Sequence, residues 1–359
     1  MNREGHLVNS IIISLIILVS ILAGTIFSYL QHFLEILLFF FLFILILRYK
    51  IKKMEYLLFI VFVFSQMGSF IINDFSVFLL NAKEFGIGIL SIIYFQRNAR
   101  KTKIVEFVIF ICCFLVVYEY AFQTFPLNIV PYLSIMKDSY GSRVLGLFLN
   151  FQLTSAILAI YFIGYTWGKR AFLIDFLLLF IVGGRMNMVG YIFQRIFNKF
   201  ISFFSGLNIL WAVTLVVPLL LLINYQDFFL EKFKLLNWGY ISGYIILKQI
   251  FNPSNYLDAL FLFPQDSVTF LTKNTLTDFS GLGIYSVVDH ASELSITQIL
   301  VKGGFFLTTL YLYVILILYK RFALFIFISL FHVSFIFNPF IIYLMSCYQF
   351  DGDYSSKAY

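Results

Sequence analysis

Apolar runs long enough to cross a lipid bilayer follow one another along this chain, and most of the junctions between them are only a few residues long. A helix needs about 20 apolar residues to span the hydrocarbon core. Hydrophobic residues make up 61% of the 359 positions and charged residues 12%, which leaves too few polar side chains to cover a water-facing surface. The sequence therefore excludes soluble and disordered proteins. It predicts an all-α polytopic membrane protein with about twelve transmembrane helices, in contact with the lipid bilayer.

Lys and Arg side chains gather in the short junctions, at residues 48–53, 97–103, 169–170 and 320–321. Such clusters mark cytoplasmic loops. The net charge of +7 therefore reports topology, and no nucleic-acid partner is expected. Alternation from these junctions predicts that both termini are cytoplasmic. The apolar run after His6 is long and lacks a cleavage-site pattern, so no cleavable signal is expected.

The same alternation predicts four parts. Residues 1–223 form an N-terminal transmembrane bundle, 224–293 a large external (periplasmic) loop, 294–348 C-terminal transmembrane helices, and 349–359 a cytoplasmic tail. The loop carries more acidic than basic side chains. A very short turn is expected at residues 29–32, and the final apolar run is expected to break at Asn338-Pro339, because the residue before a proline disfavours helix.

The segment 171–199 has two interpretations. It forms either one long helix or two short helices that turn at Gly183-Gly184, with Arg185 at the outer face. Arg195 and Lys199 are external in the first interpretation and cytoplasmic in the second. The distribution of positive charge favours the second, although each half is shorter than a usual span.

Polar residues beside the spans are the candidates for chemistry, because burying them in a membrane is costly. Residues 142–152 contain Arg143 and Asn150 where the first external loop re-enters the membrane. The Gly183-Gly184 pair allows a sharp turn that presents Arg185. A guanidinium offers a rigid donor fork suited to phosphate oxygens, but either Arg can also be an interfacial anchor.

A third segment, residues 280–293, ends the large loop with a glycine turn followed by Tyr285, His290 and Glu293. Histidine is the side chain best placed to take a proton near neutral pH. Glu293 shares a helix face with His290 if helicity begins there. The competing interpretation is a solvated loop histidine.

Metal and disulfide chemistry are not expected. Cys112 and Cys113 are adjacent in one apolar run and Cys347 lies in another, without disulfide or metal-ligand spacing. The predicted turn at 29–32, the first external connection along the chain, carries no carboxylate that could bind a metal ion. No metal site and no cofactor are therefore predicted.

The order of these three segments, followed by residues 331–339 (FHVSFIFNP), resembles the O-antigen polymerase and O-antigen ligase superfamily over residues 143–339. The resemblance implies an enzyme, a membrane glycosyltransferase of GT-C-like architecture in the bacterial cytoplasmic (inner) membrane. Its donor and acceptor are glycans linked to undecaprenyl pyrophosphate on the outer face, and a flippase and a chain-length regulator are possible partners.

Within that resemblance, Arg143 and Arg185 match the pyrophosphate-binding arginines and His290 the residue that activates the acceptor hydroxyl. Glu293 is the second candidate for the base, and Asn150 and Tyr285 are further candidates for substrate binding. The family often has an Arg in the outer-loop helix, where this chain offers Lys248, a point charge without the bidentate fork.

Three functions are compatible with the sequence. The favoured one is polymerisation of lipid-linked repeat units into O-antigen or capsule-type polysaccharide without a metal. A ligase that transfers glycan to lipid A-core uses the same chemistry with another acceptor. A non-enzymatic polysaccharide flippase is the least favoured, because most cations lie at junctions and one external loop is large.

Overall fold

The computed structural model describes residues 3–23, 27–49, 51–72, 75–122, 144–165, 169–204, 295–330 and 335–355. Within these ranges every regular element is helical and no strand is present. The helices are α1 (Arg3–Leu22), α2 (Ser28–Ile46), α3 (Lys53–Ile72), α4 (Phe75–Asn98), α5 (Lys103–Phe122), α7 (Phe151–Gly164), α8 (Lys169–Val182), α9 (Arg185–Phe204), α16 (Ser295–Leu318), the 3₁₀ turn η2 (Lys320–Phe322), α17 (Ala323–Ser329) and α18 (Pro339–Ser355).

Two of the described helices are long and apolar enough to cross a membrane, over Tyr29–Ile46 and Lys103–Ala121. Leu307–Leu318 and Lys320–Ser329 form a third span if the pair, which is bent by 99°, is one broken crossing. Shorter apolar helices cover Leu7–Leu22, Phe151–Gly164 and Phe172–Val182. The helical architecture and its membrane character agree with the sequence prediction at this coarser level.

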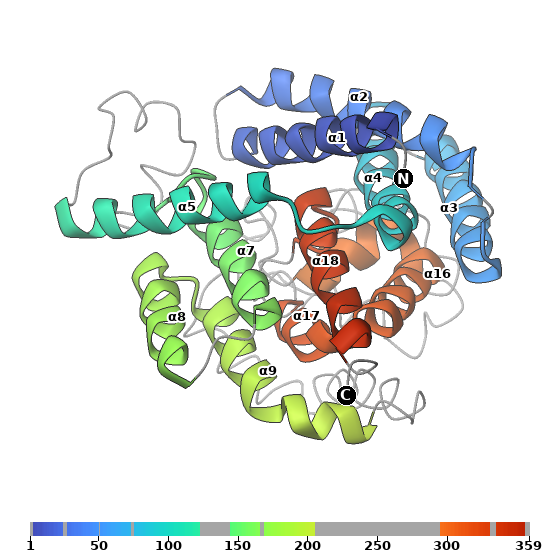
Figure 1. Cartoon of the computed structure of the whole chain (residues 1–359). Coiled ribbons are helices and arrows are strands. Elements are labelled where there is room, and N and C mark those ends of the chain that lie inside the picture. Colours follow the sequence, from blue (N-terminus) through green and yellow to red (C-terminus); the bar gives the residue numbers. More distant parts are fainter. Residues whose placement is uncertain are drawn as a thin grey trace, which may run out of the picture.

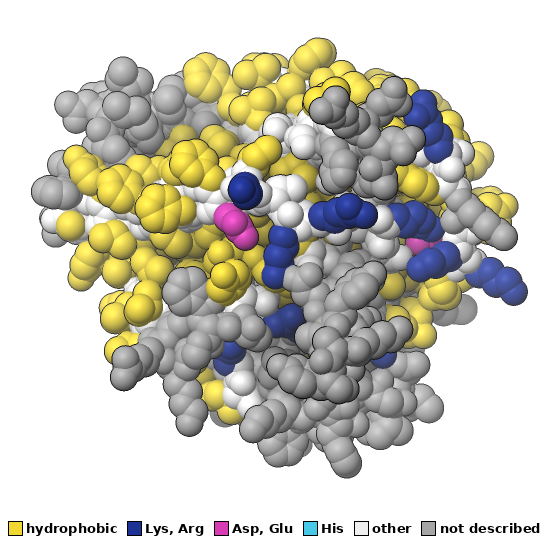
Figure 2. All heavy atoms as spheres, in the orientation of Figure 1, with side chains coloured by type: hydrophobic (Ala, Val, Ile, Leu, Met, Phe, Trp, Pro, Cys, Tyr) yellow, Lys and Arg dark blue, Asp and Glu magenta, His cyan; other side chains and the backbone are white. Residues whose placement is uncertain are grey.

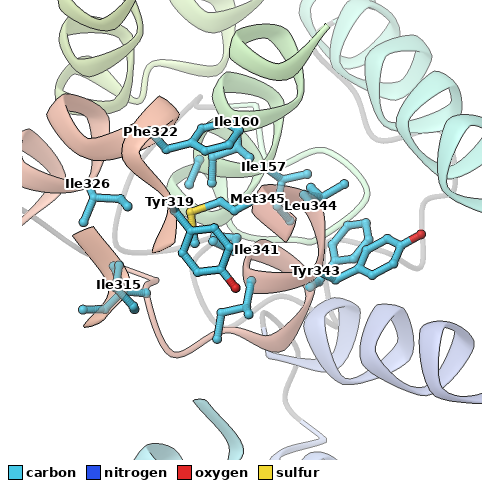
Figure 3. Packing of buried hydrophobic residues seen from close by; sticks show 14 of the residues in the cluster. Ile157, Ile160, Ile315, Tyr319, Phe322, Ile326, Ile341, Tyr343, Leu344 and Met345 are labelled. Carbon is cyan, nitrogen blue, oxygen red and sulfur yellow. The ribbon is translucent and has the colours of Figure 1, made fainter. Parts of the chain in front are cut away.

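The core lies where α18 packs against α4, α7 and α1 (Figure 1). Almost every residue of α18 from Phe340 to Tyr348 is buried, and so is the stretch Phe151–Ile160 of α7. Figure 3 shows Met345 of α18 among Ile157 and Ile160 of α7 and Tyr319 at the end of α16. A helix that is apolar all round is stable only when neighbours cover it, which explains why α18 and α7 are central.

The outer helices carry large apolar side chains on their exposed faces. Phe107, Phe110 and Phe114 of α5 are 58–68% exposed, and Phe33 and Phe40 of α2 are 57–63% exposed. Figure 2 shows how much of the visible surface is hydrophobic. Contiguous apolar surface of this extent is rare on water-soluble monomers and is suited to contact with lipid.

The basic junctions 48–53, 97–103 and 320–321 meet at one end of the helices. Arg97, at the end of α4, donates from both terminal nitrogens to Glu55, at the start of α3, at 3.0 and 2.6 Å. The guanidinium also lies over the ring of Tyr49, which follows α2. The junctions 48–53 and 97–103 are therefore neighbours, as expected if both lie on one side of a membrane.

The junction at 320–321 reaches the same end. Arg321 donates to the carbonyl oxygens of Tyr348 and Gly164, each at 2.9 Å. Lys101 lies 4.6 Å from the centre of the Tyr348 ring, and Tyr343 donates to the carbonyl of Arg100 at 2.5 Å. Figure 2 shows the Lys and Arg side chains running across one face of the molecule. Tertiary contacts thus join segments that the charge pattern alone assigned to one side.

Two predicted helix boundaries are wrong. Residues 29–32 are not a turn but belong to the first part of α2, and α1 already ends at Leu22. The sequence also predicts that the chain re-enters the membrane as a helix from Leu145, but the helix begins only at Phe151, because Gly146 and Leu149 have φ of 66° and 50° and Asn150 caps the helix. Left-handed backbone of this kind cannot continue a right-handed helix.

Two predicted breaks are confirmed. The segment 171–199 forms two helices, α8 and α9, which separate at Gly183 with φ of 78°. The last apolar run breaks before Pro339, where the side-chain oxygen of Asn338 accepts from the backbone nitrogens of Phe340 and Ile341. The helix that begins there continues to Ser355, so residues 349–355 of the predicted tail are helical.

Candidate functional site

Two of the three segments singled out in the sequence meet in the structure, at the N-terminal ends of α7 and α9. The amide nitrogen of Asn187, in the first turn of α9, donates to the carbonyl oxygen of Gln152 at 3.1 Å and to Ser155 Oγ at 2.6 Å. Gln152, Ser155 and Asn187 are all buried. A pair of hydrogen bonds in a buried setting holds the two helix ends in one fixed relation.

Gly184 allows this close approach. A Cβ atom at that position would lie under 3.0 Å from both Oγ and Cβ of Ser155, so no larger residue fits without displacing α7. Its neighbour Gly183 has a φ of 78°, which glycine adopts at no steric cost. Gly183 therefore allows the turn between α8 and α9, and Gly184 allows α9 to pack closely on α7.

Asn150 lies at the start of α7 and is 8% exposed. Its side-chain oxygen accepts from the backbone nitrogens of Gln152 and Leu153 at 3.0 and 3.1 Å, which makes it the N-cap of α7. The cap sets where the helix begins and accepts from two N–H groups of its first turn. A direct contact of Asn150 with substrate stays a prediction.

Arg185 is the first residue of α9 and is exposed. A cation at this position is electrostatically unfavourable, because a helix N-terminus carries the equivalent of roughly half a positive charge. The adjacent end of α7 adds a second such partial charge. Two helix N-termini and a guanidinium thus create a concentrated positive potential, which an anion with several oxygens can neutralise.

The backbone that leads into α7 is held by a carboxylate that the sequence prediction overlooked. Glu119, near the end of α5 and 7% exposed, accepts hydrogen bonds from the backbone nitrogens of Leu145 and Gly146 at 2.9 and 3.1 Å. Thr154 donates to the carbonyl of Leu145 at 2.7 Å. A carboxylate close to the end of an apolar run was the available signal, since ionisable residues in such runs are rare and functional.

A second polar cluster, also missed, joins α2 to α4. Lys83 forms an ion pair with Glu35, and His32 Nδ1 lies 2.8 Å from Lys83 Nζ and 3.2 Å from Glu35 Oε2. Gln31 donates to the other carboxylate oxygen of Glu35 at 2.7 Å. Lys83 and Glu35 are 9% and 14% exposed. The sequence signal for this cluster was the presence of Glu35 and Lys83 inside apolar runs, where ionisable residues are rare.

The remaining candidates cannot be placed. Arg143, Lys248, Tyr285, His290 and Glu293 lie outside the described residues. Within the residues that are described, no group of three or more His, Cys, Asp or Glu side chains is arranged to hold a metal ion. The three cysteines are free thiols.

Comparison of the chain with protein-family models, with curated proteins and with solved structures finds no match.

Proposed function

We propose that this protein is a multi-pass glycosyltransferase of the bacterial cytoplasmic membrane, with about twelve spans and a GT-C-like architecture. In this proposal it polymerises oligosaccharide repeat units linked to undecaprenyl pyrophosphate into O-antigen or capsule-type polysaccharide, on the outer face of the membrane. The observation that carries the proposal is the contact between the N-terminal ends of α7 and α9 beside Arg185. It joins two segments on which the resemblance to polymerases and ligases depends.

The reaction needs what such a site offers. An acceptor hydroxyl attacks the anomeric carbon of the donor sugar, the bond from that carbon to the pyrophosphate oxygen breaks, and negative charge develops on the leaving group. Donors fixed in place before the reaction stabilise such charge most effectively. The two helix N-termini, held together by the buried contacts of Asn187 with Gln152 and Ser155, provide a fixed positive potential of this type. The exposed Arg185 guanidinium adds hydrogen-bond donors to it.

Five residues outside the described ranges complete the proposal. Arg143 provides a second guanidinium for the pyrophosphate, since it lies two residues before Leu145, whose backbone Glu119 holds. His290 removes the proton from the acceptor hydroxyl, with Glu293 as the alternative base. Lys248 and Tyr285 contact the glycan or its phosphates. The proposal includes no metal and no organic cofactor.

Arg185→Lys tests the central element of the proposal. The substitution keeps the charge but removes the bidentate fork, so purified protein in liposomes should polymerise a lipid-linked repeat unit at least about tenfold more slowly. Arg48→Lys is the matched control, because Arg48 is also exposed but follows α2 at the end where the basic junctions meet. Equal activity of the two variants would mean that Arg185 is an interfacial anchor and does not bind the pyrophosphate.

His290→Ala tests the base. A general base contributes roughly 100- to 10,000-fold in rate, so this variant should insert normally yet leave single repeat units on the lipid carrier. Normal polymer from His290→Ala with loss of polymer in Glu293→Gln would assign the base to Glu293. Normal polymer from both variants would remove this segment from the site. Transfer to added lipid A-core in preference to a second repeat unit would identify a ligase.

A further inference from the structure

An apolar pocket of about 510 Å³ lies between α2, α3 and α4, separate from the contact of α7 with α9. Its walls are aromatic and aliphatic, with Phe39 and Phe40 from α2, Phe62 and Met67 from α3, and Leu79 from α4 among them. The volume lies within the range of about 300–1,000 Å³ that is usual for pockets that bind small molecules.

The rim of the pocket faces the same surroundings as the outer faces of the helices. Phe40, Met67 and Phe70 line the pocket and are 57–60% exposed. Exposed side chains of this kind are suited to lipid, so the molecules with ready access to the pocket are those of the bilayer. The occupant is therefore expected to be an amphiphile that enters with its hydrocarbon part.

One polar side chain in the wall lacks a partner. Gln66 is 6% exposed, and neither its amide nitrogen nor its amide oxygen has a hydrogen-bond partner among the described residues. A buried amide without partners costs free energy, and a ligand oxygen that accepts from the nitrogen removes part of that cost. Gln66 thus indicates a ligand that carries a hydrogen-bonding group as well as a hydrocarbon chain.

A cation also contributes to the wall. Lys83 lines the pocket, and its contacts with Glu35 and His32 hold the ammonium at the pocket. An ammonium group has three N–H donors, so these two contacts leave capacity for one more acceptor. Gln66 and Lys83 together provide donors for ester or phosphate oxygens next to a space for an apolar chain.

We infer that this pocket is a binding site for a membrane glycerophospholipid, with one acyl chain between α2, α3 and α4 and the ester or phosphate oxygens on Gln66 and Lys83. The volume favours one acyl chain over the much longer undecaprenyl chain of the proposed substrate. The site does not depend on the glycosyltransferase proposal, because none of its residues belongs to the contact between α7 and α9.

Fluorescence quenching of the detergent-solubilised full chain tests the inference. Phe70→Trp places a reporter in the pocket, after the three native tryptophans are replaced by Phe. Phosphatidylglycerol with a dibrominated stearoyl chain should quench this reporter saturably at low lipid-to-protein ratios. The matched reporter Phe110→Trp replaces a side chain of α5 that is 68% exposed, and it should show only gradual quenching without saturation. Equal quenching of the two reporters would overturn the inference.

Gln66→Met then tests the polar contact at nearly constant volume. Loss of one hydrogen bond should weaken lipid binding about tenfold. The lipid-free variant should at the same time be at least as thermally stable as the parent, because the unpartnered amide is gone. Unchanged lipid affinity, or a large loss of stability without lipid, would mean that Gln66 is structural and would overturn the assignment.

A competition arm separates the two lipid sources. Unlabelled phosphatidylglycerol should displace the brominated lipid more effectively than undecaprenyl phosphate does. Stronger displacement by undecaprenyl phosphate would assign the pocket to the carrier lipid and refute the phospholipid site.

Discussion

Replacing Gly184 by Ala should destabilise the contact between α7 and α9, although the change adds only a methyl group. The new Cβ would overlap Oγ and Cβ of Ser155, both at less than 3.0 Å. Ser155 cannot turn away from the overlap, since its own Cβ is involved and its backbone belongs to the buried helix α7. The two helix ends must therefore move apart.

The magnitude has two parts. Overpacking a close contact costs about 1–3 kcal/mol. Separation also stretches the two hydrogen bonds from Asn187 to Gln152 and Ser155, each worth about 0.5–1.5 kcal/mol and more if the donor stays buried. The expected loss in free energy of unfolding is about 2–6 kcal/mol.

Thermal unfolding of the detergent-solubilised protein measures the loss. With roughly 2–4 °C per kcal/mol, the conversion for chains of 150–250 residues, Gly184→Ala should lower Tm by about 4–24 °C. Gly183→Asn is the control in the same turn, because a Cβ added at this position meets nothing within 4 Å and Asn tolerates positive φ. Its Tm should change by no more than about 3 °C.

A double variant separates overlap from other effects. Ser155→Gly removes both atoms that the new Cβ would meet, at the cost of its own hydrogen bonds. Adding Gly184→Ala to that background should cost less than about 1 kcal/mol, far less than in the parent. A Gly184→Ala protein with the parent Tm, or equal costs in both backgrounds, would refute the packing described for this site.

Three further outcomes are expected. Glu119→Leu leaves the backbone nitrogens of Leu145 and Gly146 buried without an acceptor, so it should cost about 2–5 kcal/mol in SDS-titrated unfolding, whereas a surface effect would leave stability unchanged. Asn338→Ala removes the N-cap of α18 and should cost about 0.5–2 kcal/mol in the same measurement. In intact cells, a cysteine at Asn274 should react with an impermeant thiol reagent and one at Arg100 should not; the reverse pattern would invert the predicted topology.

Local chemistry determined which segments are helical and where two of them break. Long apolar runs form helices because their backbone groups are then satisfied internally, whatever the neighbours are. Gly183 and the Asn338-Pro339 pair interrupt the helix through their own backbone preferences, so both breaks could be predicted from residue type. Charge predicts only that the basic junctions share one side of the membrane, whereas the contact of Arg97 with Glu55 at the start of α3 is a result of the tertiary structure.

The beginnings of α2 and α7 needed the tertiary structure. The sequence of residues 29–32 predicts a short turn between apolar runs. In the structure, however, Gln31 and His32 belong to the helix α2 that brings Glu35 to Lys83. The residues before Asn150 are not helical, and Glu119, which is distant in sequence, binds the backbone nitrogens of Leu145 and Gly146 among them. Both boundaries depend on a partner that sequence spacing does not reveal.

The candidate site divides in the same way. Arg185 could be singled out from the sequence because a cation beside two glycines in an apolar run is conspicuous without any neighbour. Only the packing of α9 on α7 brings Asn187 to Gln152 and Ser155. This contact places the two helix N-termini together. Helix formation depends on local residue type, whereas a polar contact between helices depends on the register and rotation of both, and no single segment encodes these.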